Sequence, residues 1–301
     1  MHRAVFIISA ALAVFVAAVL PFAGRARACA TCAVGDPTLN VMGVEQPFAG
    51  RTRIATEVRH FSETSGVQGE TSVASSEQRL SLSLSHSPTP RLTLALRVPL
   101  VLRHLAFENL ATETVVGPGD ATVRARYVLY RDRTFAPSRL IWAHLGLEMP
   151  TAPIRQGPGG PLSLERQLGT GSWDTSMAIG GSYFANPYSV HGSALLFLPT
   201  RGTADSRVGT HLRTTLVGQL QPWSFLGFRL GLDARFEAAT VENGAEDPSS
   251  GGIVGYITGG LIGSPATDIV TWLNFTMPVI QALNGEQSEG WQLVLGAALD
   301  V

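Results

Sequence analysis

The sequence predicts an all-β protein, a transmembrane antiparallel up-and-down β-barrel of about 12 strands. Apolar and polar residues alternate strictly in several segments, for example from Leu80 to Ser85 and from Leu226 to Ala238. Because successive side chains of a strand point to opposite faces, each segment has one apolar and one polar face. Connections also alternate between short turns and longer polar loops, as they do in bacterial outer-membrane barrels.

The alternating segments are long enough to cross a bilayer, because a tilted β-strand needs about 9–11 residues to do so. Their polar faces carry charges along the whole length, as a wet interior requires. An even number of strands predicts that both chain ends lie in the periplasm. We expect strands at 51–61, 75–86, 91–102, 119–131, 138–150, 170–184, 188–199, 207–220, 222–238, 251–263, 267–281 and 288–301.

The predicted connections complete this pattern. Short turns are expected at 87–90, 185–187, 221–223 and 264–266. Longer loops are expected at 62–74, 103–118, 151–169, 200–206, 239–250 and 282–288. Gly, Pro, Asn and Ser are frequent in these stretches, and these residues favour turns.

The first residues indicate export. Arg3 precedes an apolar run, and Ala26-Arg27-Ala28 supplies small residues before a cleavage site at Cys29, which is the pattern of a signal peptide. A retained membrane anchor is the alternative, and Arg27 argues against a lipoprotein site. The expected domains are a signal peptide (1–28), a periplasmic N-terminal segment (29–50) and an outer-membrane β-barrel (51–301).

Composition narrows the function classes. The net charge is −1 and charged residues make up 15% of the chain, so no electrostatic pattern favours nucleic acid as a partner. The histidines are scattered and no Gly-x-Ser-x-Gly nucleophile elbow occurs. We therefore predict that the protein is not an enzyme.

Four motifs occur in order along the predicted barrel. They are Gly117-Pro118-Gly119-Asp120 before a strand with Arg126-Tyr127, Leu145-Gly146-Leu147-Glu148-Met149-Pro150-Thr151, Leu168-Gly169-Thr170-Gly171-Ser172-Trp173-Asp174, and Met277-Pro278-Val279 followed by Asn284-Gly285-Glu286 and the closing strand from Trp291. In order and spacing, residues 50–301 resemble the outer-membrane transporter family linked to the meta-pathway of phenol degradation. The resemblance implies a barrel that passes hydrophobic or aromatic compounds, and it implies no catalytic residues.

The polar face of the predicted strands supplies the candidate lumen residues. A mixed-charge interior that contacts solute is one interpretation, and charges that only pair across strands are the other. In a barrel this small, inward side chains largely fill the interior. The predicted lumen or solute-facing residues are Arg59, Arg79, Arg97, Arg124, Arg126, Trp142, His144, Glu148, His211, Arg213, Arg229, Asp233, Arg235 and Glu237.

Cys29 and Cys32 are the only cysteines and form a Cys-x-x-Cys motif near the predicted mature N-terminus. An oxidising compartment favours a disulfide, and thiolates also bind soft metals such as copper. Two ligands do not complete a closed zinc site, and no histidine follows Cys32 for haem attachment. We therefore predict no cofactor apart from a metal held by this pair.

Passive passage of small, hydrophobic or aromatic solutes through the outer membrane is the function these observations favour. The predicted partners are outer-membrane lipid, the solute and the barrel-assembly machinery, although Val301 stands where barrels commonly end in an aromatic residue. An alternative is a structural barrel whose Cys-x-x-Cys segment docks a periplasmic redox or metal-handling protein. A soluble β-sandwich with the same alternation is the third interpretation.

Overall fold

A computed structural model describes residues 49–66, 72–108, 111–134 and 137–301. The predicted signal peptide, Cys29 and Cys32 lie outside these residues. No helix in the described ranges is long and apolar enough to cross a membrane. The small elements are β7 (Gln156–Gly157), β8 (Gly160–Pro161), η2 (Leu164–Arg166), η3 (Thr203–Asp205), β13 (Val241–Glu242) and β14 (Ala245–Glu246).

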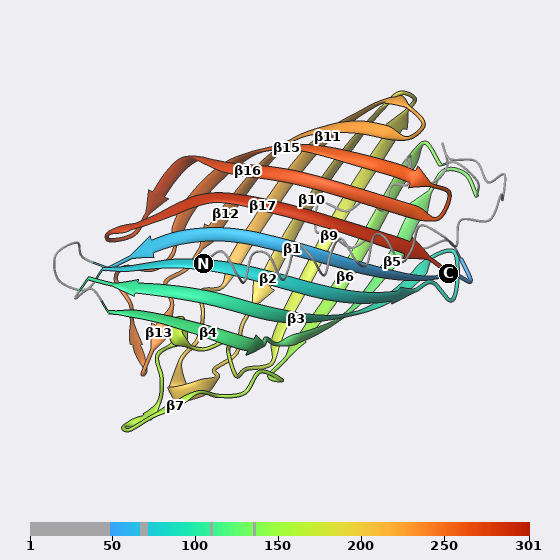
Figure 1. Ribbon diagram of the computed structural model, residues 1–301. Helices are drawn as coiled ribbons and strands as arrows, with labels where there is room; N and C mark the ends of the chain where they lie inside the picture. The colour runs from blue at the N-terminus through green and yellow to red at the C-terminus, as the bar shows by residue number, and fades with distance from the viewer. Residues whose placement is uncertain (1–48, 67–71, 109–110, 135–136) are drawn as a thin grey trace.

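A closed antiparallel β-barrel of twelve strands forms the molecule (Figure 1). Its strand order runs β2-β1-β17-β16-β15-β12-β11-β10-β9-β6-β5-β3, and a further β2–β3 pairing closes the wall. With β4 and β5 counted together as one strand, the strands are β1 (Thr52–Ser65), β2 (Val73–His86), β3 (Leu92–Phe107), β4 (Thr112–Pro118), β5 (Ala121–Arg131), β6 (Arg139–Met149), β9 (Asp174–Ala185), β10 (Tyr188–Leu198), β11 (His211–Trp223), β12 (Leu226–Glu237), β15 (Gly252–Ala266), β16 (Ile269–Leu283) and β17 (Gln287–Asp300). The predicted class and strand number are confirmed.

β4 and β5 are two parts of one strand, because both pair with β3. β4 pairs with Leu100–Ala106 and β5 with Leu92–Arg97. Among the described residues, β3 is the only strand that pairs with β4. The break between the two parts falls at Gly119 and Asp120, within the first of the four motifs.

Alternation along each strand separates the outer face from the interior. On β2, Leu82 is 58% exposed whereas its neighbour Ser81 is 1% exposed. The same contrast recurs on β12, where Leu230 and Leu232 are exposed and Asp233 is buried. A wall that exposes its leucines and buries its charges is the inverse of a soluble protein and is expected where lipid covers the outside.

Aromatic residues gather at the end of the barrel that carries the short turns. Exposed Tyr183, Tyr188 and Trp223 lie within a few residues of strand ends joined by such turns. Amphipathic rings at this depth suit a membrane–water interface. Trp142 and Trp272 are buried instead, at 3% and 4% exposure, so they pack inside the barrel.

Several predicted boundaries are wrong, and the predicted loop 103–118 is the largest error. β3 continues to Phe107 and β4 begins at Thr112. The wall here extends beyond the apolar belt, so its outer face becomes polar and the alternation that marks a strand disappears. For the same reason the predicted loops 62–74 and 282–288 are too long, because β1 reaches Ser65 and β16 reaches Leu283.

Two predicted turns are displaced by a few residues. β11 includes the predicted turn 221–223, and the chain reverses at residues 224–225 instead. β15 includes the predicted turn 264–266, and the reversal falls at residues 267–268. Both segments contain a proline, which is tolerated where a strand ends or its pairing is irregular, and the register of each strand shifts at this point.

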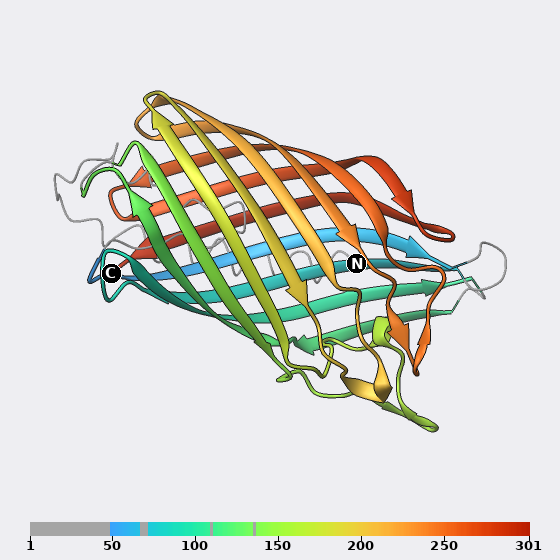
Figure 2. The ribbon, with the colours of Figure 1, turned by 180° about the vertical axis from the view of Figure 1, so that it is seen from behind.

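The long connections gather at the end of the barrel away from Val301. Figures 1 and 2 show the β7–β8 and β13–β14 regions together at that end. Backbone hydrogen bonds tie these loops to one another, including Thr203 N–H to Thr170 O and Arg207 N–H to Val241 O. The connections 150–173, 199–210 and 238–251 therefore cover one side of this mouth as a unit.

Candidate functional site

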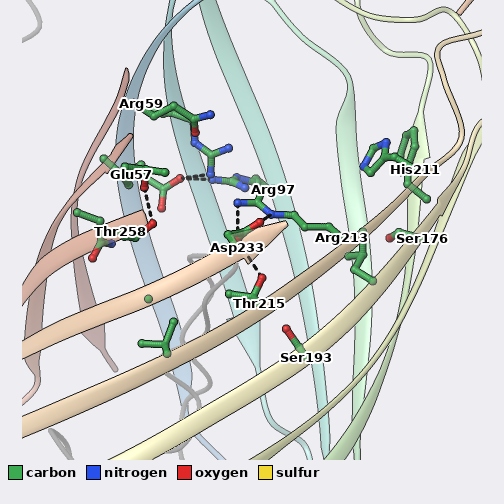
Figure 3. A pocket seen from close by; sticks show the side chains of 18 of the residues that line it. Glu57, Arg59, Arg97, Ser176, Ser193, His211, Arg213, Thr215, Asp233 and Thr258 are labelled. Carbon is green, nitrogen blue, oxygen red and sulfur yellow. Dashed lines mark hydrogen bonds and ion pairs between the residues drawn. The ribbon is translucent and has the colours of Figure 1, made fainter. Parts of the chain in front are cut away.

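A cavity of about 270 Å³ lies inside the barrel. Side chains from β1, β3, β5, β6, β9, β10, β11, β12, β15, β16 and β17 line it, and Figure 3 shows them converging on one space. These strands surround nearly the whole circumference, so the cavity is central and is not a recess in one wall. Predicted lumen residues that line it are Arg59, Arg97, Arg124, Glu148, His211, Arg213, Arg229 and Asp233.

The other predicted residues lie on the inner face beyond the cavity lining. Arg126 lies over the Trp142 ring, with its guanidinium carbon 4.5 Å from the ring centroid. Arg79 forms an ion pair with Glu77 at 2.8 Å, and Arg235 forms one with Glu237 at 2.9 Å. The remaining member of the set, His144, is buried. These positions describe the interior, whereas contact with a solute stays a prediction.

Glu57 is the acidic centre of one side of the cavity. Its carboxylate accepts a hydrogen bond from Arg97 at 2.6 Å and interacts with Arg59 at 3.5 Å. Arg59 also lies directly opposite Arg79 on the neighbouring strand. Like charges at opposed positions repel, and Glu57 and Glu77 each supply a carboxylate that offsets this repulsion.

Asp233 organises a second group of polar side chains in the cavity. Arg213 donates to both of its carboxylate oxygens, at 2.7 and 2.8 Å, and the Thr215 hydroxyl donates at 2.9 Å. A bidentate pair fixes the orientation of the guanidinium and carboxylate planes, so the Arg213 and Asp233 side chains are held in place. Figure 3 shows this group beside Arg97 in the cavity.

An apolar and aromatic surface completes the lining. Phe197 stacks on His211 with ring centroids 4.8 Å apart and planes 20° apart. Trp272, Val294 and Leu195 also line the cavity. The cavity is therefore amphiphilic, with guanidinium groups and carboxylates beside ring and aliphatic surfaces.

Further ion pairs fill the interior outside the cavity. Glu77 is fully buried and binds Arg79 and also Arg103, the latter at 2.6 Å. Arg53 pairs with Asp300 across β1 and β17. Sequence reasoning missed Arg53, Glu57 and Glu77, although each stands in phase with a residue it did name, Arg59 or Arg79.

Three of the four sequence motifs meet in space around Asp120. Its carboxylate accepts the Ala152 N–H at 2.8 Å and the Thr170 N–H at 2.7 Å. The Thr151 hydroxyl accepts the Ala121 N–H at 2.8 Å. Gly169 has no room for a side chain, because a Cβ there would lie 2.2 Å from an Asp120 oxygen. These contacts hold both ends of residues 150–173, which we call the clamp loop.

Asp174 forms the second anchor of the clamp loop. Its carboxylate accepts hydrogen bonds from the Ser172 hydroxyl at 2.7 Å, the Thr170 hydroxyl at 3.0 Å and the Thr200 N–H at 2.9 Å. Asp174 also lines the cavity. Asp174 thus both anchors the clamp loop and forms part of the cavity wall.

The clamp loop packs against the inner side of β3 and β4. Leu168 is buried with Val101 and Val115. Arg103 donates to the backbone oxygens of Glu165 and Gln167, at 2.7 and 2.8 Å. The clamp loop therefore lines the part of the β3–β4 wall nearest the mouth that lies away from Val301, and it narrows that mouth.

Asp132 is an ionisable group outside the membrane-spanning wall whose pKa is perturbed. The Asp132 carboxylate, in the connection between β5 and β6, accepts the Arg139 N–H at 3.1 Å and the Ser138 N–H at 2.9 Å. These backbone hydrogen bonds, that of Arg139 first, hold the pKa of Asp132 below its ordinary value. In the described part of the chain, no group of three or more His, Cys, Asp or Glu side chains is placed to hold a metal ion.

No protein-family model and no curated protein matches the chain. Among solved structures, the COG4313 outer membrane channel from Pseudomonas putida F1 is similar, with a TM-score of 0.64 and 15% identity over 84% of this chain and 96% of that one. The NanC porin (TM-score 0.45, 10% identity, 81% and 98% covered) and the CymD monoaromatic hydrocarbon channel (TM-score 0.43, 8% identity, 84% and 88% covered) match more weakly.

The fold and its surface define the class of protein. A closed twelve-strand barrel with leucines outside and charges inside is an outer-membrane β-barrel of porin-like architecture. The similarity to the Pseudomonas putida channel shows the shared fold. The link to phenol degradation that the sequence motifs imply stays a prediction.

Proposed function

We propose that this outer-membrane barrel is a passive channel for small solutes, including solutes with apolar or aromatic parts. The central cavity supports this proposal most directly, because an amphiphilic space of about 270 Å³ lies within a closed wall. Ligand sites combine mostly apolar surface with a few placed polar groups. The family resemblance of the motifs points to the same class of solute.

The ion pairs inside the wall favour a narrow path. Arg213–Asp233, Arg97–Glu57 and Arg103–Glu77 project from several sides of the interior, and the clamp loop narrows one mouth. Small barrels are largely filled by such side chains. We therefore expect low conductance, with selection by charge as well as by size.

Planar-bilayer recording of the purified protein tests the proposal. Arg124→Ala and Arg126→Ala each remove a positive charge from the inner face, so we expect relative cation permeability to rise in both variants. Arg91→Ala, on an exposed residue beside a short turn, is the matched control and should leave selectivity unchanged.

Solute flux provides the second measurement. Liposomes that contain the protein should swell faster in a small sugar than protein-free liposomes do. Neither conductance nor swelling above that of empty membranes would contradict a channel. Conductance with unchanged selectivity in Arg124→Ala and Arg126→Ala would limit these arginines to pairing within the wall.

A further inference from the structure

We infer that the central cavity is a binding site for a small aromatic carboxylate, with the carboxylate at Arg124 and the ring against Phe197. This inference deepens the proposed channel function and rests on it, because it names the solute class that the channel would favour. Three features of the cavity lead to it: the excess of arginine, the way the existing carboxylates are occupied, and the aromatic surface.

Positive charge exceeds negative charge in the cavity lining. Five arginines line it, against four carboxylates. Guanidinium groups enclosed by the wall attract an anion, and the interaction of charges strengthens where the local dielectric constant is below that of bulk water. A planar carboxylate matches the fork of N–H donors that a guanidinium presents.

Most of the carboxylates already have partners. Asp233 is held by Arg213 and Thr215, and Asp174 accepts hydrogen bonds from the clamp loop. Glu57 is shared by two arginines. These carboxylates therefore do not neutralise every arginine in the cavity lining, and a guanidinium group is left that can bind an anionic solute.

Arg124 is the arginine best placed to receive the anion. It lines the cavity but has no direct ion pair with a described residue, and its buried Nε has no hydrogen-bond partner. Glu148 lines the same space and interacts with Arg124 electrostatically, but no direct ion pair joins the two. An incoming carboxylate would give the Arg124 guanidinium the direct partner it lacks.

Gly146 creates the space in which these donors converge. A Cβ at Gly146 would lie 2.3 Å from the Ser176 hydroxyl oxygen, 3.1 Å from His144 Nε2 and 3.6 Å from Arg124 Cγ. The Ser176 and Thr122 hydroxyls also line the cavity. A guanidinium with hydroxyl donors beside it is a set of groups that binds carboxylates.

The remaining surface suits a ring. Phe197 is held in place by its stacking on His211, and Trp272 and Val217 add apolar area. The volume of about 270 Å³ is slightly below the roughly 300–1,000 Å³ of sites for drug-sized ligands. A single-ring carboxylate therefore fits better than a long acyl chain or an oligosaccharide.

Equilibrium binding to the detergent-solubilised full chain tests the inference, with benzoate, benzyl alcohol, benzylamine and acetate as probes. We expect benzoate to bind about ten-fold or more tightly than benzyl alcohol and acetate. Arg124→Gln should weaken benzoate about ten-fold to hundred-fold and leave benzyl alcohol unchanged. Arg124→Lys, which keeps the charge, should retain most of the preference for benzoate.

Arg91→Gln is the matched control, because it removes an exposed guanidinium far from the cavity lining. Benzoate that binds no tighter than benzyl alcohol would overturn the inference, as would equal benzoate affinity in Arg124→Gln and Arg91→Gln. Preferred binding of benzylamine would assign the cavity to cations and would also overturn it.

Sugar-driven liposome swelling separates this inference from the channel proposal. Swelling without a preference for benzoate would reject the aromatic carboxylate and keep the channel. Benzoate binding lost in Arg124→Gln, without swelling or conductance, would keep the site and reject the channel. Heat-modifiable gel mobility of each variant checks that the barrel has folded.

Discussion

Leu230→Arg tests whether the apolar outer face contacts lipid. Leu230 lies in the middle part of β12, and its side chain is 63% exposed. In a water-soluble protein, an arginine at so exposed a position would change the free energy of unfolding by no more than about 0.5 kcal/mol. On the lipid face of a barrel, an arginine near the bilayer midplane costs about 2–4 kcal/mol.

The predicted loss of about 2–4 kcal/mol corresponds to a change of about 30-fold to 700-fold in the equilibrium between folded and unfolded protein. Reversible folding into phosphatidylcholine vesicles across a guanidinium series measures it, with tryptophan fluorescence as the signal. Ile154→Arg is the matched control, because Ile154 is 49% exposed but lies in the clamp loop outside the apolar belt.

We expect Ile154→Arg to change the free energy of unfolding by no more than about 0.5 kcal/mol. If Leu230→Arg is no more destabilising than this control, the outer leucines do not lie in lipid. The lumen, the cavity and the channel would then lose their physical basis together.

Three further predictions concern the connections. Asp120→Ala removes two charge-assisted hydrogen bonds and should release the clamp loop at a cost of about 2–3 kcal/mol, seen as faster proteolysis of that loop. Gly169→Ala should have a similar effect because its Cβ meets the Asp120 carboxylate, whereas Gly159→Ala, with nothing within 4 Å, should have none. Because the pKa of Asp132 is lowered in the fold, its contacts are favourable above its unfolded pKa and are lost as pH falls through the folded value. The protection factor of the Arg139 amide, which is its exchange rate corrected for the pH dependence of intrinsic exchange, should therefore fall on acidification, but not in Asp132→Ala.

Local alternation was enough to assign the faces of the wall. It is set by the strand's own period of two, so it is visible wherever one face meets lipid. It disappears where the outer face leaves the membrane, which is why the sequence predicts a loop in place of β4 and the end of β3. Arg53, Glu57 and Glu77 could have been found from the same alternation, because each lies in phase with a predicted residue.

The contacts that hold the clamp loop could not be predicted from the alternation of apolar and polar residues. Asp120 binds Thr170 and Asp174 binds Thr200, and such pairs depend on how the strands are ordered around the barrel. The sequence showed the motifs as separate turn signals. Only the closed wall shows that three of them form one assembly.

The residues of the motifs and the residues that line the cavity are largely different sets. Asp120, Thr151, Gly169 and Thr170 hold the clamp loop through hydrogen bonds and close packing. Such contacts give the order and spacing of the motifs a structural reason, since each contact holds one segment of the chain against another. Most of the cavity lining comes from other strands, including β1, β10 and β11. Two proteins that share the motifs can therefore share the wall and the clamp loop while differing at positions such as Arg59 and Phe197, and it is there that a difference in solute should be sought.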